Sequence, residues 1–272
     1  MHKCSQEGLE KLFQGPLAEA FIELMQSMWS RGREEAEVIA KMLQRHGVSP
    51  GAKLLELGAG IGRVASHLAT MGYHVVGVEY SERFVEKGRE LLAKMSVTEA
   101  ELLVADAYTL EGVPGLGSYD AAYMTWTTLL GYGPSPECDK QLLETLHQAI
   151  KPGGVLVIAN TVSYDRAAFS QGVCSCQGPF LTMLENYALV EKPILDPETN
   201  TLTNTWTIYR LEDKNLLYLG QATFQLRLYT LKELRELATQ TGWRLEAAYH
   251  DPLRETPYRP GISKFNIVLR HV

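Results

Sequence analysis

The sequence predicts an α/β fold: an open, mostly parallel sheet of seven strands with an antiparallel last strand, plus an inserted antiparallel, β-rich lid. Three observations support this prediction. Short apolar segments alternate with amphipathic helical segments from residue 53 to residue 160. Long segments of period two follow at 201–229. The last two apolar segments are separated by too few residues for a crossover helix, so they should pair antiparallel.

Residues 1–50 are predicted to form an N-terminal helical cap. Apolar side chains recur at three- and four-residue spacing in 17–30 and 33–46, and Gly47 is a plausible helix stop. "LEKLFQGP", Leu9–Pro16, resembles a protease site used to remove purification tags. Two interpretations stay open for this stretch: an engineered remnant, or a native amphipathic turn.

Residues 51–160 and 230–272 are predicted to form the core. Strands and helices alternate there, which favours right-handed crossovers and a parallel sheet covered on both faces. The expected strands are 53–58, 74–80, 100–106, 119–126 and 154–160, and the expected helices are 61–71, 82–95 and 136–150. Thr230 and Glu233 form a capping-box pattern before one more helix. Strands at 243–250 and 264–271 should close the sheet.

Residues 161–229 are predicted to be an inserted lid. The segment 161–200 reads as irregular, whereas 201–212 and 216–229 alternate and are joined by a turn at 213–215. The insertion leaves from the end of the fifth strand, so we expect it to lie over the ligand edge and close an acceptor pocket.

Composition limits the classes of partner. The net charge is −6, the pI is near 5.7, and no long basic run is present, which disfavours nucleic acid. No apolar stretch is long enough to cross a membrane. The sequence has four cysteines, for which we expect free thiols in a reducing cytoplasm. No cluster of His, Asp and Glu at ligand spacing suggests a catalytic metal.

The most informative stretch is "LLELGAGIGR", residues 54–63. Gly58, Gly60 and Gly62 remove Cβ atoms between a strand and a helix, where an open α/β sheet presents its ligand crevice. Glu79 ends the next strand and Asp106 the one after. Glu56, Glu79 and Asp106 are thus three acids at the ends of successive strands, beside a glycine turn. This arrangement predicts a crevice that fits a nucleoside.

Each acid also has an ordinary structural explanation. Glu56 could form an ion pair with a helix, Glu79 could cap the next helix together with Ser81, and Asp106 could be a turn residue. Their combination in this order favours the binding site.

These motifs resemble those of class I S-adenosylmethionine-dependent methyltransferases. "LLELGAGIGR" is similar to that family's glycine motif, "VVGVEYS" to its ribose-binding strand, "LVADA" to its adenine-binding motif and "IKPGGVLVIAN" to the turn into its fifth strand. The resemblance covers about residues 35–160 and resumes at 230–272. It implies a Rossmann-like fold and S-adenosyl-L-methionine as cofactor.

The resemblance also implies roles for individual residues. Glu56 and the glycine turn would line the methionyl part of the cofactor, Glu79 would hold the ribose diol, and Tyr80 would cover the adenine. Asp106 would meet the adenine edge. The full set of implied cofactor-binding residues is Glu56, Gly58, Ala59, Gly60, Gly62, Glu79, Tyr80, Asp106, Ala107 and Met124, the last through its backbone facing the sulfonium.

"MTWTTLLGYG", residues 124–133, resembles a subgroup that methylates small molecules. Tyr132 and Trp126 are therefore candidates for the substrate pocket, as aromatic walls suit a sulfonium. The acceptor stays open between an amine, a hydroxyl, a carboxylate and a carbon, and so does the oligomeric state. We further expect that Arg33 and Glu37 could reach the charged end of the cofactor. Arg166, Arg210 and Arg227 could bind an acidic acceptor, or they could lie on a solvated strand face.

Two other functions remain possible from the sequence. A nicotinamide-dependent dehydrogenase could use the same crevice, although its glycine spacing is G-x-G-x-x-G and the third glycine here comes one position early. The chain could also be a non-catalytic, methyltransferase-like binding partner.

Overall fold

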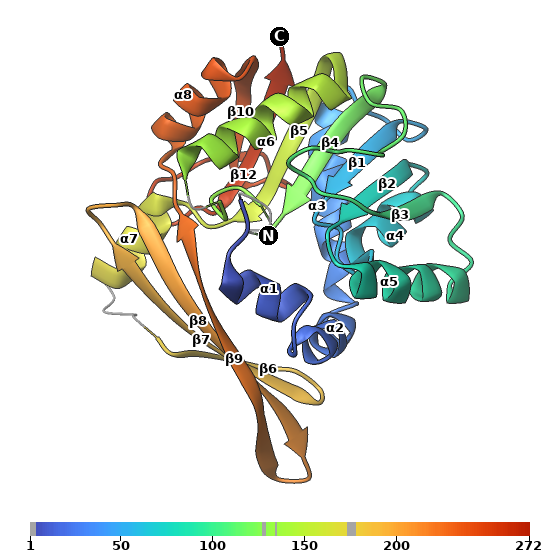
Figure 1. The fold of residues 1–272 in the computed structure, drawn as a ribbon. Coiled ribbons are helices and arrows are strands. Elements are labelled where there is room, and N and C mark those ends of the chain that lie inside the picture. Colours follow the sequence, from blue (N-terminus) through green and yellow to red (C-terminus); the bar gives the residue numbers. More distant parts are fainter. Residues whose placement is uncertain (1–3, 127–128, 134, 173–177) are drawn as a thin grey trace.

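The computed structural model describes residues 4–126, 129–133, 135–172 and 178–272, and its centre is an eight-stranded sheet (Figure 1). The strand order is β11-β10-β12-β5-β4-β1-β2-β3. These strands are β1 (Lys53–Leu57), β2 (His74–Glu79), β3 (Ala100–Val104), β4 (Tyr119–Thr125), β5 (Ile150–Thr161), β10 (Trp243–Asp251), β11 (Thr256–Pro257) and β12 (Phe265–His271).

Strands β1 to β5 run parallel, and β12 pairs antiparallel with both β5 and β10. The predicted parallel sheet with its reversed last strand is therefore confirmed. The prediction of seven strands missed β11, which has only two residues at the edge and carries no periodicity to detect. The parallel arrangement brings the carboxyl ends of β1 to β5 to one edge of the sheet.

Helices cover both faces of this sheet (Figure 1). Leu54 packs with α3 and α4, whereas its neighbour Leu55 packs with α6 and α8 on the opposite face. Both are fully buried, which explains the uninterrupted apolar sequence of β1. The helices of the core are α3 (Arg31–Arg45), α4 (Arg63–Thr70), α5 (Glu82–Lys94), α6 (Pro136–Ala149) and α8 (Leu231–Gln240).

Two further helices precede α3: α1 (Glu7–Phe13) and α2 (Ala18–Ser27). Helix α1 overlaps the stretch that resembles a protease site, and Leu9 and Leu12 in this overlap are buried. A Cβ on Gly8 would stand 1.8 Å from the carbonyl oxygen of Thr223 in the lid. Helix α1 therefore packs on the lid as an integral part of the fold, and only glycine permits that approach.

The lid is a separate antiparallel sheet of order β6-β7-β8-β9, seen below the core in Figure 1. Its strands are β6 (Phe180–Met183), β7 (Tyr187–Asp196), β8 (Thr201–Glu212) and β9 (Asn215–Arg227), and α7 (Tyr164–Gly172) leads into it. The predicted hairpin is confirmed as β8 and β9.

The expectation that 161–200 is irregular was wrong, because it contains α7, β6 and β7. Strand β7 contains Pro193, and proline cannot donate a hydrogen bond to a neighbouring strand. Among the described residues β6 pairs only with Ala188–Glu191, so Pro193 lies where β7 has an unpaired edge.

Helix α8 has the predicted capping box. The Thr230 hydroxyl accepts a hydrogen bond from the backbone N–H of Glu233, and the Glu233 carboxylate accepts one from the N–H of Thr230. We expect Thr230→Ala to lower the free energy of unfolding by about 1 kcal/mol, because a helix N–H loses its partner. Urea unfolding measures this. Thr239→Ala in the last turn of the same helix is the control, and an equal loss in both variants would contradict the role of the cap.

Candidate functional site

The glycine turn links β1 to α4. Gly58, Gly60 and Gly62 have φ angles of 66°, 57° and 77°, a region that favours glycine. At Gly62 a Cβ would also stand 2.9 Å from a methyl group of Leu102. The turn therefore requires glycine for its backbone conformation, and Gly62 also for the close packing at the start of α4.

The carboxylate of Glu79 holds this turn against the end of β2. One oxygen accepts a hydrogen bond from the backbone N–H of Gly60 at 2.9 Å, and the other accepts one from Ser81 at 3.0 Å. Both interpretations of Glu79 from the sequence thus find support in the geometry: it contacts the start of α5, and it also lines a cavity at the strand ends. Burial raises its pKa above the ordinary value.

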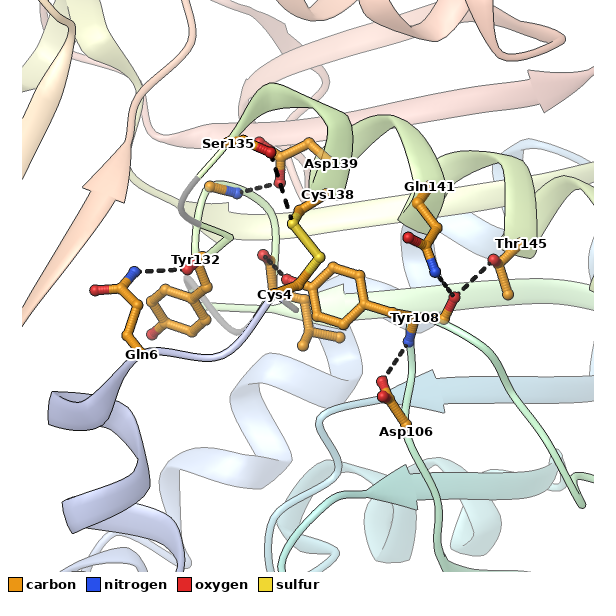
Figure 2. Close-up of a disulfide and its surroundings, with 12 residues drawn as sticks. Cys4, Gln6, Asp106, Tyr108, Tyr132, Ser135, Cys138, Asp139, Gln141 and Thr145 are labelled. Carbon is orange, nitrogen blue, oxygen red and sulfur yellow. Dashed lines mark hydrogen bonds between the residues drawn. A yellow bond between two sulfur atoms is a disulfide. The ribbon is translucent and has the colours of Figure 1, made fainter. Parts of the chain in front are cut away.

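Asp106 follows β3 and forms a turn, with one carboxylate oxygen accepting a hydrogen bond from the N–H of Tyr108 at 2.8 Å (Figure 2). It stands beside the same cavity as Glu79. We call this space the strand-end cavity; its volume is about 110 Å³. The sheet edge contributes Gly58, Val78, Glu79, Tyr80, Ala105, Asp106, Ala107, Tyr108, Leu129 and Tyr132 to its wall.

The N-terminal segment forms the opposite wall of the strand-end cavity. Its lining residues are Cys4, Ser5, Leu9, Glu10 and Phe13. The Gln6 amide donates hydrogen bonds to the carbonyl oxygens of Tyr132 and Gln225, and the Ser81 hydroxyl donates to that of Phe13. The segment is thus fastened to the loop after β4, to the lid and to the end of β2. No sequence pattern indicated this role.

A disulfide joins Cys4 to Cys138 at the start of α6 (Figure 2). The expectation of free thiols is therefore wrong for these two cysteines. Their separation of 134 residues gives no local pattern, and only the folded chain brings them together. Cys174 and Cys176 lie outside the described residues.

Glu56, by contrast, lines neither of the cavities described here. Its side chain is buried between β1 and α4, beside Tyr123 and within reach of the charge of Arg63. Burial raises its pKa from 4.5 to about 8, and Oε2 has no hydrogen-bond partner among the described residues. Met124 is likewise buried in the core, at the end of β4.

A buried charged cluster lies beside the glycine turn. The Arg63 guanidinium donates a hydrogen bond to one oxygen of Glu35 at 2.7 Å, and the Trp126 indole N–H donates to the other at 2.8 Å. The guanidinium also lies 5.3 Å from the centre of the Trp126 ring, a cation–π contact. Trp126 has a φ of 65°, which is strained for a bulky residue, as is common at functional sites.

Arg33 and Glu37, which were expected to reach the charged end of the cofactor, are not part of this cluster. Arg33 and Glu37 form an exposed ion pair with each other on α3. Glu35, between them in sequence, points inward instead. Arg63 was not predicted to be a site residue, although its position directly after the glycine motif is a signal that could have identified it.

A second cavity, which we call the lid cavity, has a volume of about 990 Å³. The inner face of the lid sheet borders it on one side, and α2, α3, α7 and the ends of β4, β5 and β12 border the rest. Trp126 and Arg166 line this cavity. Tyr132 lines the strand-end cavity instead, where its ring packs edge-on against Phe224.

Metal-binding groups and membrane-spanning helices were sought among the described residues. Within them, no group of three or more His, Cys, Asp and Glu side chains could hold a metal ion. No helix in this part of the chain is long and apolar enough to cross a membrane.

Residues 54–154 match a family model described as a methyltransferase domain. The chain is 34% identical over 111 residues to a protein-L-isoaspartate O-methyltransferase from Cytophaga hutchinsonii, which covers 41% of this chain and 44% of that protein. It is 32% identical over 106 residues to the S-adenosyl-L-methionine-dependent Diels-Alderase iccD from Talaromyces variabilis, covering 38% and 34%. The chain thus spans less than half the length of these two relatives.

Solved structures resemble nearly the whole fold. The CcbJ methyltransferase from Streptomyces caelestis has a TM-score of 0.70 at 22% identity, covering 89% of each chain. CalS10, an amino pentose methyltransferase from Micromonospora echinaspora solved with bound SAM, has a TM-score of 0.65 at 18% identity, covering 89% and 92%. At these identities the likeness concerns the fold.

The raised pKa of Glu56 predicts a pH dependence of stability. Between pH 4.5 and about 8 the folded protein keeps this carboxyl protonated while the unfolded chain ionises it, so stability falls as pH rises. The slope from this one group is about 1.4 kcal/mol per pH unit within that window. Glu56→Gln should remove it. Urea unfolding of both proteins from pH 5 to 9 tests this, and a wild-type-minus-variant difference that is independent of pH would contradict it.

The disulfide predicts a second effect on stability. Because the bond closes a long loop, Cys4→Ser should lower the free energy of unfolding by about 2–4 kcal/mol without reductant. A phosphine reductant should bring the wild type to the value of the variant and leave the variant unchanged. Equal unfolding midpoints of the untreated proteins would mean that the bond does not form in solution.

Proposed function

We propose that the protein is an S-adenosyl-L-methionine-dependent methyltransferase acting on a small molecule, because residues 54–154 match a family model described as a methyltransferase domain. The observation that carries the proposal is the strand-end cavity. There the carboxylate of Glu79 is fixed to the glycine turn and stands beside Asp106 on the neighbouring strand end.

The residues at this edge fit an adenosyl cofactor. Each oxygen of Glu79 accepts one backbone N–H and retains a lone pair for a ribose hydroxyl. Tyr80 and Ala107 supply apolar surface for an adenine ring, and Asp106 supplies an acceptor for its amino group. The backbone of the glycine turn, with Gly58, Ala59, Gly60 and Gly62, would face the methionyl part.

Glu56 and Met124 have proposed roles near the reacting end. The unpartnered oxygen of Glu56 suits a cationic group, whose charge would lower the pKa of this carboxyl. Arg63, paired to Glu35, moderates the negative charge there. Met124 would contribute its backbone at the end of β4.

The cofactor supplies an electrophilic methyl group on a sulfonium, so the chain must position an acceptor and exclude water. Glu35 and Trp126 belong both to the charged cluster beside the glycine turn and to the wall of the lid cavity. The lid cavity and the glycine turn are therefore neighbours at these two residues. Positioning of this kind lowers the activation free energy by about 7–11 kcal/mol in ideal intramolecular reactions. A neutral amine needs no general base, whereas a hydroxyl does.

The proposed setting is the cytoplasm, without a nucleic-acid partner. The acidic total charge supports the second part of this proposal. Because Cys4 and Cys138 form a disulfide and disulfides are rare in a reducing cytoplasm, imaging of the labelled protein in cells tests this setting.

Calorimetry with S-adenosylhomocysteine and with NAD tests the cofactor. We expect S-adenosylhomocysteine to bind, and Glu79→Ala to weaken it by about 10- to 100-fold, because hydrogen bonds to a charged group are lost. Glu86→Ala on the exposed face of α5 is the matched control and should bind as the wild type does. Unchanged affinity in Glu79→Ala would remove Glu79 from the site, and tighter binding of NAD would favour a dehydrogenase.

Turnover requires a separate measurement. Release of S-adenosylhomocysteine from S-adenosylmethionine in the presence of amines, phenols and carboxylic acids distinguishes an enzyme from a non-catalytic partner. A chain that binds cofactor but yields no product with a broad panel would fit the partner instead.

A further inference from the structure

The inner face of the lid sheet carries polar groups where packing alone would favour apolar ones. The side chains that it presents to the lid cavity are Phe180, Thr182, Leu189, Glu191, Pro193, Leu202, Asn204, Trp206, Phe224 and Leu226. Glu191 and Asn204 lie in the middle of this set, on the adjacent strands β7 and β8. A carboxylate and an amide at such positions destabilise the lid unless their hydrogen-bonding groups find partners.

Two residues of the lid lie close to the carboxylate of Glu191. It stands opposite Trp206 on β8, and the side chains of Asn204 and Trp206 lie near its carboxylate, although Nε1 of Trp206 has no hydrogen-bond partner among the described residues. Burial raises the pKa of Glu191, and these two neighbours and the charge of Lys264 lower it in part. No described residue forms a direct ion pair with Glu191, so its negative charge is not neutralised by contact.

In the same arrangement, one polar atom of the Asn204 side chain has no hydrogen-bond partner among the described residues. Its side chain is only 6% exposed, and its Oδ1 has no hydrogen-bond partner among the described residues. A carboxylate accepts hydrogen bonds, so the amide nitrogen of Asn204 must be the group that faces Glu191. The remaining oxygen is therefore a buried acceptor that lacks a donor, at the wall of the lid cavity.

The wall of the lid cavity that faces the lid sheet also carries charged side chains. Lys264 donates a hydrogen bond to Asn160 at the end of β5, and its pKa is lowered by burial and by nearby Arg166. Glu35 and Glu191 act on Lys264 in the opposite direction. The core side of the cavity thus carries Lys264 and Arg166 together with Glu35, whereas the lid side carries Glu191 and the unpartnered Oδ1 of Asn204.

From these contacts we propose that Glu191 and Asn204 bind an amino group of the methyl acceptor, which would be a small amine with an apolar or aromatic body. This inference rests on the proposed function, since it assigns the substrate class of the same site. An ammonium donates several hydrogen bonds and carries the charge that Glu191 lacks. The aromatic rings of Trp206 and Phe224 beside the pair favour a cation as well.

Three probes of one shape test the proposal: cyclohexylmethylamine, cyclohexylmethanol and cyclohexanecarboxylate. Ligand-observed NMR titrations give their dissociation constants, without and with saturating S-adenosylhomocysteine. We expect the amine to bind about tenfold more tightly than the alcohol, as a charged hydrogen bond provides. Glu191→Gln should abolish this preference, and Asn204→Leu should weaken the amine by about three- to tenfold.

Glu198→Gln, on the exposed turn between β7 and β8, is the matched control and should retain the preference. Circular dichroism and thermal unfolding establish that each variant is folded. If Glu191→Gln fails to fold, the wild-type selectivity and Asn204→Leu still decide.

Two results would overturn the inference: an amine preference that survives Glu191→Gln, or tighter binding of the carboxylate, which would assign the cavity to Lys264 and Arg166. The proposed function fails separately, when S-adenosylhomocysteine does not bind. Since the titrations are also run without it, the amine site is tested in either case.

Discussion

The hydrogen bonds between Glu79 and two backbone amides are the interaction on which the site depends. The three glycines of the turn are in the left-handed region and carry no side chains, so the position of the turn depends on its buried residues Ala59 and Ile61 and on contacts to its backbone. Glu79 fixes Gly60 to the end of β2 and thereby joins two strand ends into one surface. Because this carboxylate is buried, the two N–H groups compensate for its desolvation as well as locate the turn.

The charged cluster at Arg63, Glu35 and Trp126 extends this surface toward the lid. It connects the first turn of α4, helix α3 and the end of β4 through the two oxygens of one carboxylate. The strained backbone of Trp126 shows that the fold tolerates a local cost to place this ring. The start of α4 beside the glycine turn is therefore connected to the wall of the lid cavity through hydrogen-bonded side chains.

The core could be predicted because periodicity and strand ends are local properties of sequence. Glu79 and Asp106 were found by their place after apolar segments, and both line the strand-end cavity. Glu191 and Asn204 could not be found this way, since alternating strands of the lid show which residues share a face but not which face is inward. Cys4 and Cys138 lacked any signal, because tertiary packing alone brings them together.

The wall formed by residues 4–13 has a practical consequence for handling the protein. Cys4 lines the strand-end cavity, so a peptide fused at the N-terminus would be tethered only a few residues from it. The other terminus is at the opposite end of the sheet, because β12 runs antiparallel to β5, and Val272 is 67% exposed (Figure 1). Purification handles and fluorescent labels therefore belong after Val272.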